Sequence, residues 1–240
     1  MNAGERLLDL LEPNDNVLFY TSPYKRTMQT TEGIVESIKK KNIPYRIHEE
    51  PRLREQDFGN FQGSAKEMAK VWKERAHYGH FFFRIPNGES AADVYDRIAG
   101  FNETLFRQFH TEKFPSVLIL VSHGIWCRVF LMKWFRWSYE KFEGFRNLGH
   151  CEFLVMEQEQ GSQKYGLLTP LRTWDDPPDT LVVPPSLKRT ESNRHIKSLR
   201  FRALRVRDDS SIKKQQEKDA LIKEAFMQAS IEESNGDIDD

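Results

Sequence analysis

One histidine, His123, occupies a position that is typical of ligand-binding residues. It follows Val117–Val121, five apolar residues that predict a strand buried on both faces, as in a parallel sheet. After Gly124 the apolar residues recur at helical spacing, so a helix follows the turn. Such turns lie where open α/β sheets bind ligands, and the helix start presents unpaired N–H groups there. His123 and Gly124 are therefore candidate binding residues, although a histidine that only caps the helix would give the same pattern.

A basic pair at a second predicted helix start indicates a site for an anion. This helix is predicted to run to about Lys41, with Ser22 as its N-cap and Pro23 as its first residue. Lys25 and Arg26 then lie in the first turn, at the positive end of the helix dipole, where cations are unfavourable. A bound anion would explain this placement, and a guanidinium offers phosphate a planar fork of donors. An ordinary solvated arginine is the alternative.

Glu55 is the carboxylate that we single out as a candidate proton donor. It lies in the segment 51–63, whose glycines, aromatics and charges follow neither a helical nor a strand period, so a loop is predicted. Loops carry functional residues more often than cores do. A surface salt bridge from Glu55 to Arg52 or Arg54 is the alternative, and the spacing alone favours it.

The elements that must position these residues alternate between helix and strand along residues 1–178. Strands are predicted at 17–20, 45–49 and 117–121, with an edge strand at 151–157 and a further segment at 165–172. Helices are predicted at 3–11, 64–78 and from Ser90, where Asp93 completes a capping pattern. The expected fold class is α/β, a three-layer α/β/α arrangement around a mostly parallel sheet.

Composition excludes several classes of protein. Lys+Arg and Asp+Glu both number 36, so the net charge argues against a general nucleic-acid-binding protein. Two cysteines do not make a disulfide framework, and a reducing compartment is expected. The N-terminus shows no signal-peptide pattern, and charges interrupt the longest apolar stretch, so we expect a soluble, cytoplasmic chain. No metal-ligand spacing is seen.

The composition changes beyond residue 178. A run rich in Lys and Arg extends to Lys218 and is followed by an acidic end, so residues 179–240 are predicted to be a charged tail, partly disordered or helical. A solvated regulatory tail is the simpler interpretation. The alternative is weak attachment of the basic run to an anionic membrane or an acidic protein.

Four segments, in this order, together resemble one family. They are Thr21–Thr30 (TSPYKRTMQT), Leu53–Gly63 (LREQDFGNFQG), Pro86–Ser90 (PNGES) and Val121–Gly124 (VSHG). Over residues 1–175 the chain resembles the histidine phosphatase superfamily, the phosphoglycerate-mutase-like proteins, and in particular their phosphatase branch. The resemblance implies attack of a histidine on a small phosphate monoester and hydrolysis of the resulting phosphohistidine, without a metal or cofactor. It also implies that Arg26, His123 and Gly124 bind the phosphoryl group, that His123 and Glu55 are catalytic, and that Glu55 protonates the leaving group.

One departure concerns the nucleophile. The family carries it in an Arg-His-Gly motif after its first strand, and this sequence contains no Arg-His-Gly. We therefore expect an N-terminally incomplete domain that lacks this strand, so that the strands at 17–20 and 117–121 have unpaired edges and the chain alone is loosely folded and inactive. The alternatives are a non-catalytic protein that binds phosphorylated ligands or a partner, and a phosphoglycerate mutase. The short spacing of 22 residues between Gly63 and Pro86 favours a phosphatase over a mutase.

Overall fold

The computed structural model describes residues 3–59, 64–111, 114–158, 164–176 and 200–205. The chain divides into two units, Met1–Glu55 with Val94–Val206 and Gln56–Asp93 with Arg207–Asp240. The elements in chain order are α1 (Ala3–Leu8), β1 (Val17–Thr21), α2 (Lys25–Lys40), β2 (Tyr45–Glu49), the 3-10 helix η1 (Pro51–Leu53), α3 (Ala65–Tyr78), α4 (Ala91–Phe109), β3 (Val117–Ser122), α5 (Gly124–Phe135), α6 (Tyr139–Gly144), β4 (Phe153–Gln158), β5 (Tyr165–Leu167) and β6 (Arg200–Arg205).

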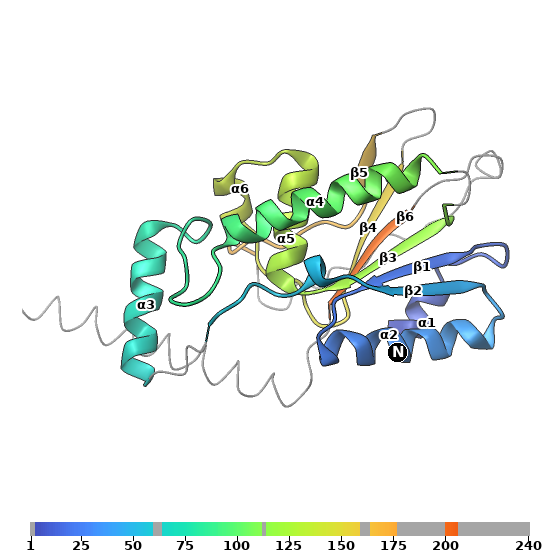
Figure 1. Cartoon of the computed structure of the whole chain (residues 1–240), viewed down its shortest axis with the longest axis horizontal. Helices are drawn as coiled ribbons and strands as arrows, with labels where there is room; N and C mark the ends of the chain where they lie inside the picture. Colours follow the sequence, from blue (N-terminus) through green and yellow to red (C-terminus); the bar gives the residue numbers. More distant parts are fainter. Residues whose placement is uncertain (1–2, 60–63, 112–113, 159–163, 177–199, 206–240) are drawn as a thin grey trace, which may run out of the picture. The chain divides into compact units, whose positions relative to one another are not determined.

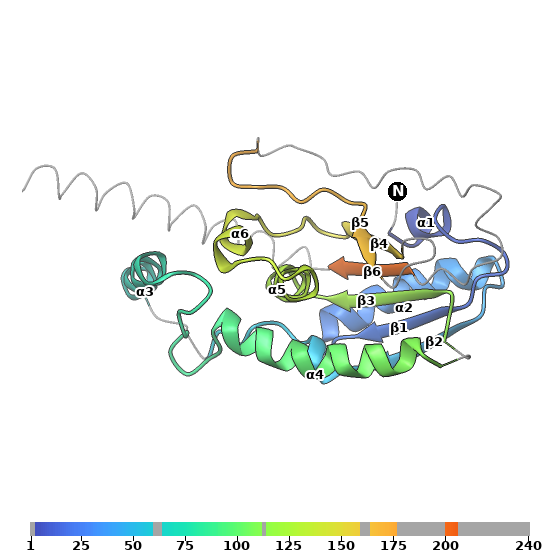
Figure 2. The same ribbon diagram turned by 90° about the horizontal axis from the view of Figure 1, so that it is seen from above.

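The first unit is built on a six-stranded sheet with the order β2-β1-β3-β6-β4-β5. The strands β2, β1, β3 and β6 are parallel, and β4 pairs antiparallel with both β6 and β5. Figure 2 shows β1 and β3 pointing toward the same end of the sheet. Every residue of β1 and β3 is buried, as the apolar run Val117–Val121 predicted for β3.

Helices cover both faces of this sheet, which confirms the expected three-layer α/β fold (Figure 1). On one face, Leu7 of α1 and Ile34 and Ile38 of α2 pack against strand residues such as Phe19 and Ile119. On the other face, Phe101 of α4 contacts the rings of Tyr20 and Trp126, with centroids 5.6 and 5.9 Å away. Val94, Ile98, Phe101 and Leu105 recur at helical spacing along α4 and are fully buried, so this side of the helix belongs to the core.

The strand β6 comes from beyond residue 178, where the sequence predicted only a charged tail. It lies between β3 and β4. Arg202 of β6 is paired with Ile119 of β3 on one side and with Val155 of β4 on the other. The expectation of unpaired edges is therefore wrong: β1 pairs with β2 and β3, and β3 pairs with β1 and β6. The rest of the predicted tail, at 179–199 and 206–240, lies outside the described residues.

Two further predictions differ from the structure. The strand β4 was predicted as an edge strand, but β6 and β5 flank it and the edges of the sheet are β2 and β5. The helix α2 begins at Lys25, with Tyr24 as its N-cap, rather than at Pro23 with Ser22 as N-cap. Both differences arise from contacts between residues that are distant in the sequence, which local patterns do not report.

The second unit contributes α3 and the chain on either side of it. Ser64 and Glu67 form a capping box at the start of α3. The Ser64 hydroxyl accepts a hydrogen bond from the Glu67 amide, and the Glu67 carboxylate accepts one from the Ser64 amide. Among the helices that the structure describes, in both units, none is long and apolar enough to cross a membrane.

Candidate functional site

The candidate site forms where β1 and β3 end. These strands are parallel neighbours with Thr21 opposite Val121, so the segments that follow them leave the sheet side by side. His123 directly follows β3 and is the N-cap of α5, whereas Arg26 is the second residue of α2, which follows β1. Gly124 is buried and opens α5, so its N–H belongs to the helix start. The topology thus brings together residues that lie 97 positions apart.

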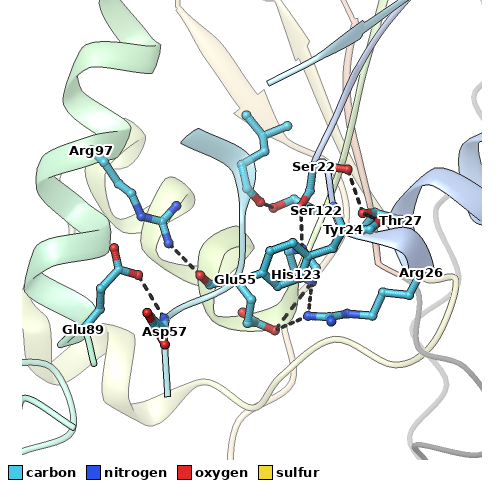
Figure 3. Close-up of polar contacts among 11 residues, drawn as sticks. Ser22, Tyr24, Arg26, Thr27, Glu55, Asp57, Glu89, Arg97, Ser122 and His123 are labelled. Carbon is cyan, nitrogen blue, oxygen red and sulfur yellow. Dashed lines mark hydrogen bonds and ion pairs between the residues drawn. The ribbon is translucent and has the colours of Figure 1, made fainter. Parts of the chain in front are cut away.

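Arg26, Glu55 and His123, the three residues singled out from the sequence, converge in the structure (Figure 3). The Arg26 Nη2 atom lies 2.9 Å from His123 Nδ1. The Glu55 Oε2 atom lies 3.9 Å from Arg26 Nη2 and 3.7 Å from His123 Nδ1. The side chain of His123 is 1% exposed, that of Glu55 15% and that of Arg26 32%. The site therefore has a buried imidazole, and its cation remains accessible from solvent.

Two residues at the site were not predicted to take part in it. The hydroxyl of Ser22, expected to cap α2, instead lies 2.8 Å from His123 Nε2. The ring of Tyr24 meets the ring of His123 edge-on, with centroids 5.2 Å apart, and the Arg26 guanidinium lies over the same tyrosine, 4.8 Å from its centroid. Tyr24 is thus in contact with both the imidazole and the cation. The only sequence signal for these roles was their place directly after a buried strand.

The main chain that carries Glu55 is held by hydrogen bonds from three directions. The Ser122 hydroxyl at the end of β3 donates to the carbonyl of Leu53, at 2.7 Å. Trp126 Nε1 of α5 donates to the carbonyl of Arg52, also at 2.7 Å. From α4, Arg97 donates to the carbonyls of both Arg52 and Glu55, at 2.7 and 3.0 Å. Each of these hydrogen bonds goes to a main-chain carbonyl. The donors therefore fix the position of the segment that carries Glu55.

Arg52, one of the two partners considered for Glu55, pairs with Glu50 instead. Its Nε and Nη2 atoms lie 2.8 and 2.7 Å from the two carboxylate oxygens of Glu50, and its Nη1 donates to the carbonyl of Gly100. Burial raises the pKa of Glu50, but the hydrogen bonds and charge of Arg52 outweigh burial, so this pKa is lower than usual. The hydrogen bond to Glu50 raises the pKa of Arg52. Arg52 is therefore not the partner of Glu55, whose carboxylate lies near Arg26 and His123.

The side chains that meet at the site could bind an anion. In the part of the chain that the structure describes, no group of three or more His, Cys, Asp or Glu is arranged to hold a metal ion. A guanidinium and an imidazole are donors that suit phosphoryl oxygens, and a partly buried carboxyl beside them can exchange a proton with a bound ligand.

Comparison with known proteins identifies the family. The model of the histidine phosphatase superfamily (branch 1) matches residues 2–169, and the chain belongs to this superfamily. It is 42% identical over 220 residues to the broad-range acid phosphatase DET1 of Saccharomyces cerevisiae, an alignment that covers 69% of the chain and 66% of the yeast protein. It is 43% identical over 197 residues to the phosphoglycerate mutase-like protein AT74 of Arabidopsis thaliana, covering 75% of the chain and 61% of that protein.

The chain thus spans less than two thirds of the length of both relatives. Among solved structures, the native mycobacterial glucosyl-3-phosphoglycerate phosphatase superposes with a TM-score of 0.52 at 18% identity, covering 72% of the chain and 81% of that structure. At this identity the likeness shows a shared fold. It independently supports the α/β architecture described above.

Proposed function

We propose that this protein is a phosphatase that hydrolyses small phosphate monoesters through a phosphohistidine. The observation that carries the proposal is the convergence of Arg26, His123 and Glu55 at the ends of two parallel strands. The similarity to a broad-range acid phosphatase supports it. The attacking histidine, in this proposal, comes from an Arg-His-Gly segment that the 240-residue sequence does not contain.

Each residue has a role that follows from its chemistry. Phosphoryl transfer requires positive charge and donors placed around the phosphoryl oxygens, which Arg26, His123 and the N–H of Gly124 would supply. The departing alkoxide requires a proton. Glu55 lies within 4 Å of both Arg26 and His123, so a phosphoryl group bound by these two residues would hold its ester oxygen near the Glu55 carboxyl.

A second candidate function is a non-catalytic protein that binds phosphorylated ligands or a partner. The observation that favours it is the lack of Arg-His-Gly, because Arg26 and His123 would still bind a phosphate without a nucleophile. A phosphoglycerate mutase is the remaining alternative within the family, since the relative AT74 is named as a phosphoglycerate mutase-like protein.

One experiment separates these functions. The 240-residue chain and a form extended at its N-terminus by an apolar strand ending in Arg-His-Gly would be assayed with p-nitrophenyl phosphate. To bring its histidine to the site, the added strand would have to replace β6 beside β3. We expect phosphate release from the extended form only, lost when the added histidine is changed to alanine. With an alkyl phosphate, whose departing alkoxide needs a proton, Glu55→Gln should lower the rate about 100- to 10,000-fold, the usual contribution of a general acid.

Other outcomes would reassign the protein. Phosphate binding without turnover by either form would favour the non-catalytic function, and transfer between phosphoglycerates without hydrolysis would favour a mutase. Phosphate release by the 240-residue chain that is lost in His123→Ala would make His123 the nucleophile.

A further inference from the structure

We propose that Tyr24 is a positioning residue, whose ring holds the guanidinium of Arg26 in place before an anion binds. The contacts that carry this inference lie within the protein. Its consequence, tighter binding of the anion, rests on the anion site of the proposed function.

Tyr24 occupies the N-cap of α2, but its side chain does not cap the helix. Its backbone has φ −70° and ψ 136°, the extended conformation of an N-cap residue, and its side chain makes no capping hydrogen bond. The residues favoured at an N-cap are Ser, Thr, Asp and Asn, because their side-chain oxygens accept from amides of the first turn. A tyrosine thus stands where a capping residue would stabilise α2 more, which indicates that its ring has another role.

The Tyr24 ring contacts both side chains that would hold the anion, and the three residues lie together in Figure 3. The Cζ atom of Arg26 lies over the ring, 4.8 Å from its centroid, which is a cation–π contact. The centroid of the His123 ring lies 5.2 Å from that of Tyr24, at an interplanar angle of 66°, which is an edge-to-face arrangement. One aromatic ring therefore packs against both the cation and the imidazole.

The ring meets Arg26 at a different place from the polar groups of the site. The distances of 2.9 Å to His123 Nδ1 and 3.9 Å to Glu55 Oε2 are both measured from one atom of Arg26, Nη2. Contacts at a single atom leave the plane of the guanidinium able to turn, whereas a ring that faces its central carbon restricts this plane. Because the Arg26 side chain is 32% exposed, the surrounding atoms enclose it only in part, and the contact with Tyr24 matters for its orientation.

A guanidinium that is already oriented binds an anion at a lower entropic cost. Arginine offers phosphate two parallel hydrogen bonds only when its planar fork faces the anion. Without the ring of Tyr24, Arg26 would have to be ordered at the moment of binding. The cost of ordering one such side chain corresponds to a dissociation constant that is about two- to tenfold higher.

The positioning role is tested without a ligand, by ¹⁵N relaxation of the Arg26 Nε–H group in the full 240-residue chain. The signal is assigned by its loss in Arg26→Lys. We expect a lower order parameter, and so a more mobile guanidinium, in Tyr24→Ala than in the wild type. Tyr24→Phe retains an aromatic ring and should retain the wild-type value.

Tyr24→Ser separates the effect of the ring from the stability of α2. Like Tyr24→Ala it removes the ring, but a serine at this N-cap can accept a hydrogen bond from an amide of the first turn, so it should melt at a higher temperature than Tyr24→Ala. Both variants should nevertheless show the same loss of order at Arg26. Order that recovers with the melting temperature in Tyr24→Ser, or a wild-type order parameter in Tyr24→Ala, would overturn the role of the ring.

Calorimetric titration with inorganic phosphate tests the consequence for binding. Tyr24→Ala and Tyr24→Ser should each bind phosphate about two- to tenfold more weakly than the wild type, and Tyr24→Phe as tightly as the wild type. Equal affinities despite a more mobile Arg26 would overturn this consequence and leave the anion site intact. Failure of the wild type to bind phosphate would overturn it together with the proposed anion site, while the relaxation measurements would still decide the role of Tyr24.

Discussion

Arg97 donates a hydrogen bond of 3.0 Å from its Nη2 to the main-chain carbonyl of Glu55. Its Nη1 donates to the carbonyl of Arg52 at 2.7 Å, so one guanidinium of α4 bridges both ends of the segment 52–55. The planar fork of an arginine suits two acceptors in this arrangement, and a lysine could hold only one of them in the same geometry. The position of the candidate proton donor thus depends on a residue of another helix.

Arg97→Ala should loosen this segment. The carbonyls of Arg52 and Glu55 would each lose a charge-assisted hydrogen bond, and we expect a loss of about 1 to 3 kcal/mol in the free energy of unfolding. Hydrogen exchange at the amides of residues 53–55 should become faster. Arg107→Ala, at an exposed position of the same helix, is the control and should change neither quantity. Equal exchange in both variants would show that Ser122 and Trp126 hold the segment without Arg97.

The ion pair of Glu50 with Arg52 should make stability depend on pH. The Glu50 pKa is lower in the folded chain than its ordinary value of 4.5, so its contribution is present above that value and is lost as pH falls through the folded pKa. Glu50→Gln should therefore destabilise the protein by about 1 to 3 kcal/mol at neutral pH. The difference from the wild type should shrink as the pH is lowered below 4.5.

Urea unfolding of the wild type and Glu50→Gln across this pH range measures the difference. Glu103→Gln is the matched control, since Glu103 is exposed on α4 and the same substitution there should cost no more than about 0.5 kcal/mol. A deficit in Glu50→Gln that stays constant from neutral to acidic pH would contradict the assigned ion pair.

Removal of β6 should destabilise the sheet. Without it, β3 and β4 would each expose a row of backbone N–H and C=O groups within the sheet, at about 1 to 3 kcal/mol for each group left unsatisfied. Several such losses rival the stability of about 5 to 15 kcal/mol that a domain has. A chain ending at Leu199 should therefore lose its cooperative thermal transition.

A chain ending at Arg207 keeps β6 and is the control. It should melt cooperatively, and so should the full chain. Identical transitions for the chains ending at Leu199 and Arg207 would show that the sheet does not need this strand.

The parts of the fold that were predicted from the sequence are those with a local signal. The apolar run at Val117–Val121 predicted a strand because a short run that is apolar throughout is typical of a strand buried on both faces, and the strand is one residue longer. The resemblance to the family implied a common site for Arg26 and His123, and the structure brings them within 2.9 Å because two strand-to-helix turns of a parallel sheet open at the same edge.

The remaining features depend on contacts that no local pattern contains. Ser22 occupies a sequence position typical of a helix N-cap, but its hydroxyl contacts the imidazole of His123, 101 residues further along the chain. Arg97 acts through main-chain carbonyls, and any sequence between residues 52 and 55 would offer those. The strand β6 reads Arg-Phe-Arg-Ala-Leu-Arg, and three charges in six residues predict a solvated segment rather than an inner strand of a sheet.

The anion site itself should appear as stabilisation by phosphate or vanadate, lost with Arg26. A ligand that binds only the folded chain stabilises it by mass action, by about 2.7 kcal/mol at 100 times its dissociation constant. For a domain of this size, this is a rise in melting temperature of about 5 to 10 °C. Arg26→Ala should abolish the rise. Because Arg26 also lies 2.9 Å from the buried His123 Nδ1, its loss should destabilise the unliganded chain by about 1 to 3 kcal/mol. Lys25→Ala removes an exposed cation from the same helical turn and should keep the full rise. Equal stabilisation of the wild type and Arg26→Ala would show that the anion binds elsewhere.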